Sequence, residues 1–249
     1  MTSNTPAVEL RHVRKAFGDR RVLDDVSLVV PAGRSVCILG RSGTGKSVTL
    51  KHIVGLLLPD EGQVLVEGED VTQLRGADLA RVRKRVGLLF QHAALFDSIS
   101  VGENVAFPLR RHTRKSEGEI RERAQDLLAQ VGLDREYDKM PAELSGGMKK
   151  RAGLARALVL DPPIVLADEP SAGLDPVTAA EIDALLLDLN ERSKTTLIVV
   201  THNIPSARML GDELIFLHEG RIIERGDAAA LERSGSPLVR EFMRSEGSG

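Results

Sequence analysis

One glycine-rich stretch, residues 40–47, constrains the fold of this chain more than any other feature. An apolar run at residues 36–39 precedes it, and a segment with apolar residues at helical spacing follows it. In this strand–turn–helix context the pattern G-x-x-x-x-G-K-[ST] binds phosphate, because loop N–H groups point inward and the helix adds its positive end. The alternative is a flexible turn that matches by chance. The residues predicted to contact a nucleotide are Gly40, Arg41, Ser42, Gly43, Thr44, Gly45, Lys46, Ser47 and Val48.

The overall composition is that of a globular protein with a sizeable core, at 42% hydrophobic and 28% charged residues. The net charge of −2 argues against nucleic acid as a partner. The one cysteine, Cys37, lies in the apolar run and is expected to be buried, in a reducing compartment. Residues 1–9 lack the apolar core of a signal peptide, and no apolar run approaches the ~18 residues of a membrane span. We therefore expect a protein that cannot cross a membrane alone.

The order of the elements predicts an α/β fold with a mostly parallel core sheet, an N-terminal antiparallel β subdomain and an inserted helical subdomain. Two β-rich segments around Gly18 predict a strand pair, and residues 214–224 predict a hairpin. Continuous apolar runs at residues 164–167 and 196–200 are typical of strands buried on both faces. Only helix and loop signals occur between Gln91 and Leu160. We expect one domain over residues 1–249, with the core at 1–91 and 161–233, the helical subdomain at 92–160 and a tail at 234–249.

Several helix boundaries can be predicted from local signals. The helix after the glycine-rich loop is expected to continue to the breaker at residues 59–62. Ser116 and Glu119 form a capping box, and Ser145 caps a helix expected at residues 148–160. Asp175 is an N-cap that is followed by proline at the first helical position.

Polar residues follow four of the predicted strands at the point where each strand ends. Because ligands bind outside the carboxyl ends of parallel strands, we expect these residues to meet at one crevice. Lys46 would hold the outer phosphates there, and Ser47 and Asp168 would hold Mg²⁺. Glu169 would act as the general base. Gln91 would contact the metal or the water, and His202 would donate to the γ-phosphate. Without the loop upstream, the acidic pair at the strand end could equally be a polar strand end before a turn.

Phe17 lies at the end of a predicted strand, directly before Gly18. Its ring could stack on an adenine base, or it could be an ordinary core or surface aromatic. The residue pattern leaves both interpretations open.

The stretch Leu144-Ser145-Gly146-Gly147-Met148 opens a helix whose first turn carries three cations, at residues 149–151. Cations at a helix N-terminus oppose the helix dipole by roughly 0.3–1 kcal/mol each. Three together suggest a nearby anion, although an ordinary cap with solvated side chains is the alternative. Since the loop at residues 40–47 already cradles one nucleotide, this second site could serve the nucleotide of another copy.

Taken together, these motifs resemble the nucleotide-binding subunit of an ABC transporter, and the resemblance covers essentially the whole chain. It rests on the glycine-rich loop, Gln91, LSGGM at 144–148, IVLADE at 164–169, SAGLD at 171–175 and His202. The resemblance implies a P-loop NTPase fold and a head-to-tail dimer that binds two ATP molecules, with Mg²⁺. The residues of one copy that would face the nucleotide of the other are Ser145, Gly146, Gly147 and Asp175. Phe17 falls at the adenine-stacking position, where tyrosine is commoner, and Asn203 replaces the more usual aspartate after His202.

A second resemblance narrows the family. Residues 88–98, 101–105 and 107–109, together with Met148 and the tail at 237–242, resemble the ATPases of Mla/Mce-type lipid transport systems. This implies ATP hydrolysis that drives phospholipid transport through a separate membrane permease, which docks near the Gln91 loop. It also implies a lipid-binding Mce-type component, a peripheral location on the cytoplasmic face of the inner membrane, and no nucleic acid. The tail would reach toward the partner protomer, unless it is a disordered end.

Three other functions are weaker alternatives. An importer of polar solutes or a lipoprotein-release system would use the same motor. A soluble ABC ATPase acting on nucleic acid is disfavoured by the net charge and by the single phosphate loop. A simple phosphate-loop kinase would need neither residues 144–148 nor His202.

Overall fold

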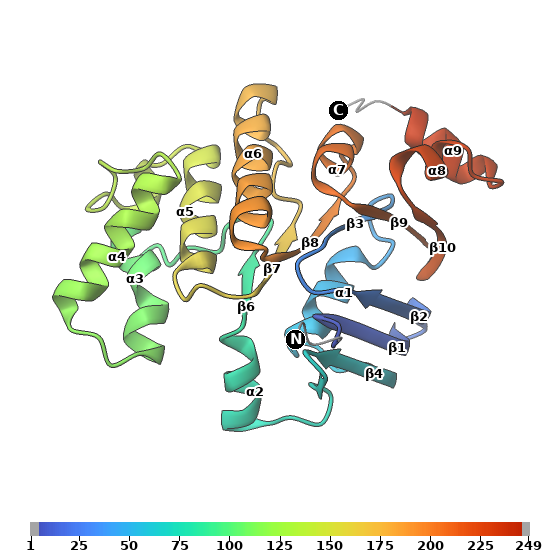
Figure 1. Ribbon diagram of the computed structural model, residues 1–249, viewed down its shortest axis with the longest axis horizontal. Helices are drawn as coiled ribbons and strands as arrows, with labels where there is room; N and C mark the ends of the chain where they lie inside the picture. Colours follow the sequence, from blue (N-terminus) through green and yellow to red (C-terminus); the bar gives the residue numbers. More distant parts are fainter. Residues whose placement is uncertain (1–4, 246–249) are drawn as a thin grey trace.

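The computed structural model describes residues 5–245, and its strands form two sheets (Figure 1). The antiparallel sheet has the order β2-β1-β4-β5, and consists of β1 (Val8–Phe17), β2 (Arg20–Val30), β4 (Glu61–Val66) and β5 (Glu69–Asp70). The second sheet has the order β10-β9-β3-β8-β7-β6, and only the β9–β10 pair is antiparallel. Its strands are β3 (Ser35–Leu39), β6 (Val86–Leu89), β7 (Ile164–Asp168), β8 (Thr196–Thr201), β9 (Glu213–His218) and β10 (Arg221–Gly226). The α/β fold with a mostly parallel core sheet is therefore confirmed.

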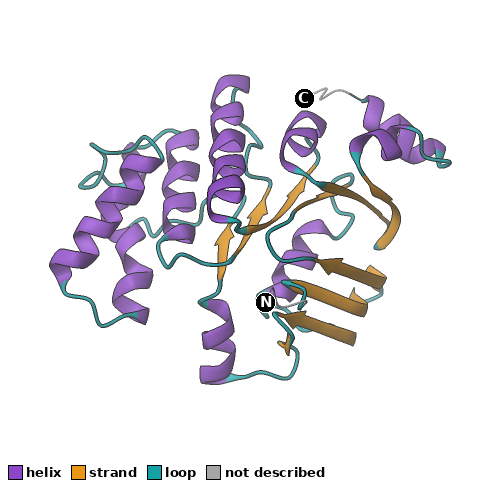
Figure 2. Ribbon diagram, in the orientation of Figure 1, coloured by secondary structure: helices purple, strands orange, loops and turns teal. Residues whose placement is uncertain are grey.

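The helices lie in distinct groups around the large sheet (Figure 2). The first group, on the β6 side, contains α3 (Val101–His112), α4 (Glu117–Gln130), the 3₁₀ turn Pro141–Glu143 and α5 (Gly146–Leu158). The others are α1 (Lys46–Ile53), α2 (Gly76–Arg83), α6 (Pro176–Ser193), α7 (Ile204–Leu210), α8 (Ala228–Glu232) and α9 (Pro237–Arg244). Within residues 5–245, none of these helices combines the length and the apolar character needed to span a membrane.

Both faces of the large sheet are buried, as the continuous apolar strands predict. Val36 and Ile38 of β3 belong to the core that also contains apolar residues of the antiparallel sheet and α1. Cys37 and Leu39 point to the opposite core, which contains residues of α6 and α7. Successive side chains of a strand face opposite sides, so a strand between two cores must be apolar throughout. Helices α3, α4 and α5 enclose a third core of their own.

The predicted helix caps form as the sequence indicates. Ser116 accepts a hydrogen bond from the Glu119 N–H while the Glu119 carboxylate accepts one from the Ser116 N–H, which completes the capping box. Ser145 accepts from the Met148 N–H at the start of α5. Asp175 accepts from two N–H groups in the first turn of α6. Each cap fixes where a helix enters the fold.

Two helix boundaries differ from the sequence expectation. Helix α1 ends at Ile53, because Gly55 takes a left-handed conformation with φ +64° well before the breaker at residues 59–62. The residues beyond that point do not continue a core helix, since Leu56 and Leu58 are exposed. Helix α5 covers Gly146–Leu158 instead of residues 148–160, because helical residues begin directly after the Ser145 cap.

The tail folds onto the body of the chain. Val239, Phe242 and Met243 of α9 are buried, and the centroid of the Phe242 ring lies 4.9 Å from that of Phe216. The interpretation of the tail as a disordered end is therefore wrong over Pro237–Arg244. The remainder of the tail, at residues 246–249, lies outside the described residues.

Gly87 in β6 provides a test of how tightly α5 packs on the sheet. A Cβ atom at this position would lie 2.5 Å from the carbonyl oxygen of Ala157, so main chain would have to move. We expect Gly87→Ala to lower the free energy of unfolding by about 1–3 kcal/mol, measured by chemical denaturation. The matched control is Gly118→Ala in α4, where a Cβ would meet nothing within 4 Å. This control should be neutral or stabilising by up to about 1 kcal/mol, and equal stability of the two variants would contradict the packing.

Candidate nucleotide-binding site

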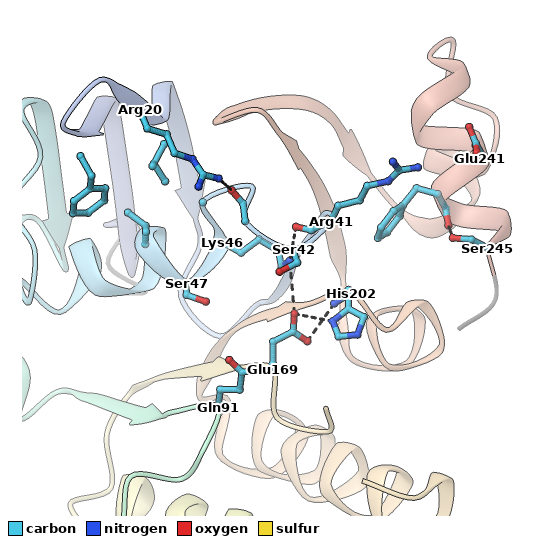
Figure 3. Close-up of a pocket in the computed structure, with 16 residues that line it drawn as sticks. Arg20, Arg41, Ser42, Lys46, Ser47, Gln91, Glu169, His202, Glu241 and Ser245 are labelled. Atoms are coloured by element: carbon cyan, nitrogen blue, oxygen red, sulfur yellow. Dashed lines mark hydrogen bonds and ion pairs between the residues drawn. The ribbon is translucent and has the colours of Figure 1, made fainter. Parts of the chain in front are cut away.

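A cavity of about 670 Å³ opens at the carboxyl ends of the parallel strands (Figure 3). Its size is within the usual range for small-molecule sites. The loop after β3 forms much of its wall, and Gln91, Glu169 and His202 contribute from the ends of β6, β7 and β8. The sequence prediction that these strand ends converge therefore holds for the residues that line the cavity.

Glycine is required at two positions of the loop. Gly40 has φ +155°, and a Cβ there would lie 2.3 Å from the carbonyl oxygen of Leu217. Gly45, at the start of α1, has φ +106°, and a Cβ there would lie 2.7 Å from the carbonyl oxygen of Val22. Because glycine has no Cβ atom, the main chain can curl tightly at these two positions. The loop then presents its N–H groups and the N-terminal end of α1 to an anion.

Lys46 is buried at the loop with its ammonium group facing the cavity. Its Nζ donates to the carbonyl oxygens of Gly40 at 2.7 Å and Arg41 at 3.1 Å. The carboxylate of Glu169 lies 3.7 Å from the same nitrogen. Burial lowers the pKa of Lys46, and the negative charge of Glu169 opposes that effect. The protein therefore holds a cation at the point where a phosphate group would add a favourable negative charge.

Ser47 and Asp168 are in direct contact, since the Ser47 hydroxyl donates to Oδ1 of Asp168 at 2.8 Å. Burial raises the pKa of Asp168, while this hydrogen bond lowers it. A hydroxyl, a buried carboxylate and the nearby amide of Gln91 are hard oxygen donors of the kind Mg²⁺ prefers, so these residues fit the ion. Within residues 5–245, no group of three or more His, Cys, Asp or Glu side chains offers another metal site.

Glu169 and His202 form a hydrogen-bonded pair at the edge of the cavity (Figure 3). Nδ1 of His202 lies 2.9 Å from Oε1 of Glu169, and the His202 main-chain N–H donates to Oε2 at 3.3 Å. The Glu169 side chain is 10% exposed, whereas the imidazole is 61% exposed. The carboxylate is thus held inside the cavity while the histidine can reach a ligand from the solvent side.

Asn203 does not weaken the placement of His202. Its side chain accepts from the N–H of Ser206 as the N-cap of α7, and its N–H donates to the hydroxyl of Thr201. Asparagine caps a helix as well as aspartate does. His202 is held by Glu169 instead, so asparagine in place of the more usual aspartate at position 203 leaves the Glu169–His202 pair intact.

Phe17 lies at the rim of the cavity, at the end of β1. Its side chain is 48% exposed, so the interpretation as a core aromatic is wrong. The ammonium group of Lys15 lies 5.6 Å from the ring centroid. The open ring face can therefore stack on a planar base.

The start of α5 lies away from this cavity. Among the described residues, those lining the cavity do not include Ser145, Gly146, Gly147 or Asp175. Asp175 caps its own helix, and a hydrogen bond from the Thr178 hydroxyl holds the pKa of Asp175 below its usual range. These residues therefore do not contribute to the wall of the cavity beside the loop.

Two of the three cations at the start of α5 have partners within the chain. Lys150 donates to the carbonyl oxygens of Glu169 and Ala172, and Arg151 lies 3.6 Å from the carboxylate of Glu181. The expectation of a nearby anion is therefore wrong for Lys150, which contacts main-chain oxygens, whereas Arg151 does have a carboxylate beside it. The charge pattern alone could not reveal partners that are brought close only by the fold.

Some cavity residues were missed by sequence reasoning. Arg20, at the start of β2, donates to the carbonyl oxygen of Gly43. Glu241, Phe242 and Ser245 line the cavity from the end of the chain. Apolar residues at positions 239, 242 and 243 have helical spacing, which is a signal that could have predicted a packed α9.

Residues 23–172 match the protein-family model described as ABC transporter. This chain belongs to the ABC transporter family. The relatives that match it are named as ATP-binding proteins of transport systems. The sequence resemblance to this family is thereby confirmed.

Two groups of curated relatives are similar to the chain. The intermembrane phospholipid transport system ATP-binding protein MlaF of Haemophilus influenzae is 39% identical over 246 residues, which cover 99% of this chain and 93% of that protein. The probable ribonucleotide transport ATP-binding protein mkl of Mycobacterium tuberculosis is 46% identical over 237 residues, which cover 95% of this chain. The chain spans only 66% of the length of that mycobacterial relative.

The fold is also similar to solved structures. The dimeric structure of MJ0796, a bacterial ABC transporter cassette, superposes with a TM-score of 0.84 at 36% identity, covering 88% of this chain and 98% of that one. A second structure of MJ0796 in a post-hydrolysis state, bound to ADP and phosphate, gives a TM-score of 0.83. The P-loop ATPase fold is thus confirmed from both sequence and structure.

Proposed function

We propose that this chain is the ATPase subunit of an ABC transporter and drives phospholipid movement through a separate integral membrane permease. The observation that carries this proposal is the match to MlaF, which covers almost the full length of both proteins. The proposal places the chain on the cytoplasmic face of the inner membrane as a peripheral subunit. A lipid-binding Mce-type component would complete the system.

The contacts around the cavity support a division of roles in hydrolysis. The loop and Lys46 would hold the phosphates of ATP, and Ser47, Asp168 and Gln91 would hold Mg²⁺. When bound, the ion would neutralise charge on the β- and γ-phosphate oxygens. Glu169 would accept the proton of the attacking water, and His202 would donate to the γ-phosphate.

A second copy would complete the site. Ser145 and Gly146 are exposed at the start of α5, and they do not line the cavity of their own chain. Two head-to-tail copies would place them, with Gly147 and Asp175, against the nucleotide held by the other loop. The MJ0796 cassette is dimeric in its solved structure, which supports the proposal of a dimer.

The permease would dock beside the Gln91 loop. A second cavity of about 340 Å³ opens there between α2, β6, α3 and α5. Phe96 and Phe107 line it; they are 47% and 45% exposed, and their ring centroids lie 5.1 Å apart. An exposed aromatic pair beside a hollow suits a helix of a membrane partner.

We also propose the division into a core at 1–91 and 161–233, a helical subdomain at 92–160 and a tail.

Phe17 offers a test of how the base is bound. We expect Phe17→Ala to weaken the binding of ATP by roughly three- to tenfold, because stacking contributes about 0.5–1.5 kcal/mol. Phe17→Tyr keeps the ring and should bind ATP as the native chain does. Titration of each variant with a fluorescent ATP analogue measures this. Equal affinity of Phe17→Ala and the native chain would contradict stacking.

A second candidate function has one supporting observation. The mkl relative is named for ribonucleotide transport, so an importer of a polar solute with the same motor is the alternative. Affinity purification of the chain from detergent-solubilised membranes distinguishes the two. We expect an integral membrane permease with bound phospholipid, whereas a solute permease without lipid would contradict the proposal.

A further inference from the structure

Lys150 is a buried cation that the roles above leave unused. It is 6% exposed, whereas its neighbours Lys149 and Arg151 are only partly buried. Burial lowers the pKa of Lys150, and the negative charge of Glu169 opposes this. Removing an ammonium group from water is unfavourable unless specific partners replace the water. The contacts of Lys150 therefore carry more information than those of a surface lysine.

These contacts are main-chain oxygens at the end of β7. The Lys150 Nζ donates to the carbonyl oxygen of Glu169 at 3.1 Å and to that of Ala172 at 2.5 Å. The N–H of Ala172 also donates to the Glu169 carbonyl, at 3.3 Å. Lys150 thus ties α5 to the turn that follows the carboxylate of the cavity.

The main chain of Glu169 has a conformation that needs such support. Its φ is +48°, in the left-handed region that non-glycine residues rarely adopt. On one side, its N–H donates to the carbonyl oxygen of Val200 in β8 at 2.9 Å. On the other side, its carbonyl oxygen accepts from Lys150. The strained residue is therefore held from β8 and from α5, and its carboxylate points at His202 and Lys46.

We propose that Lys150 is a positioning residue that fixes the carboxylate of Glu169 from the helical side of the cavity. This inference rests on the role of Glu169 in the proposed function. It goes further, because Ser145 caps α5, so that a shift at the start of this helix changes the position of Glu169. Contact of a second copy with Ser145 would then act on hydrolysis through Lys150.

A long side chain that ends in hydrogen-bond donors is required for this role, since an apolar replacement cannot make the contacts. Methionine fills a similar volume but donates no hydrogen bond to the two carbonyl oxygens. Arginine has a longer reach but keeps the charge and several donors. Lys150→Met should therefore release the turn, and Lys150→Arg should restore part of the restraint.

The test compares Lys150→Met and Lys150→Arg in the full chain with the native protein. The matched control is Lys139→Met, which removes a surface lysine that pairs with Glu136. We expect Lys150→Met to lower kcat by about tenfold or more while the Kd for a fluorescent ATP analogue changes less than about threefold, as for a group that acts in the transition state. Lys150→Arg should recover much of kcat, and the control should match the native chain.

A merely structural role gives a different pattern. It would lower the melting temperature and weaken nucleotide binding together with kcat, and that outcome overturns the inference. Native kcat in Lys150→Met also overturns it. If Lys150→Met does not fold, Lys150→Gln keeps one donor group and decides by the same split between kcat and Kd. Native turnover in Glu169→Gln would instead refute the role of Glu169 in the proposed function.

Discussion

A chain with Glu169→Gln is expected to bind ATP and to lose turnover by a factor of about 100 or more. The amide keeps the shape of the side chain but cannot accept a proton from water. The carboxylate it replaces is buried, 2.9 Å from His202 and 3.7 Å from Lys46, so the amide occupies the same place in the cavity. Phosphate release measures the turnover.

The same variant should accumulate with ATP bound. Because uncleaved ATP would hold two copies together, we expect a dimer by size-exclusion chromatography with light scattering when ATP and Mg²⁺ are present. Glu122→Gln on the exposed face of α4 is the matched control and should behave as the native chain. Full hydrolysis by Glu169→Gln would refute its role as the base.

Lys46→Met should abolish turnover and weaken ATP binding by more than about tenfold. The lysine places a positive charge beside the loop, and its loss leaves the phosphates of ATP without that positive charge. The stem of methionine has a similar length, so packing around it changes little. Isothermal titration with ATP measures the affinity.

Stability separates this effect from misfolding. Removing one partner of a buried ion pair is destabilising, so we expect the melting temperature to fall, and affinity is compared at a temperature at which both chains are folded. Lys139→Met again serves as control, since it removes an exposed lysine. Unchanged affinity for ATP in Lys46→Met would contradict the assignment of the loop as the phosphate site.

Much of the site follows from the sequence because its parts lie at strand ends. The carboxyl ends of parallel strands share one edge, so Gln91, Glu169 and His202 could be placed near the loop without a structure. The continuous apolar runs at β7 and β8 likewise indicated that both faces of these strands are buried. These inferences depend on how side chains alternate between the two faces of a strand and on local turns.

Other features depend on contacts between distant segments. Lys150 meets the carbonyl oxygen of Glu169 only because α5 packs beside the end of β7, and its charge alone suggested a nearby anion. The direct hydrogen bond between Glu169 and His202 depends on how β7 and β8 align. The early end of α1 depends on the left-handed conformation of Gly55. A glycine permits this conformation, but its presence in the sequence does not predict it.

The central claim is that ATP hydrolysis by this chain moves phospholipid through a membrane partner. The direct measurement uses the complex purified from membranes and reconstituted in liposomes, with a fluorescent phospholipid as the transported probe. We expect lipid transfer with ATP and Mg²⁺, and none when the complex carries Glu169→Gln. Uptake of a polar solute such as a ribonucleotide, with ATP hydrolysis but no transfer of lipid, would contradict the account.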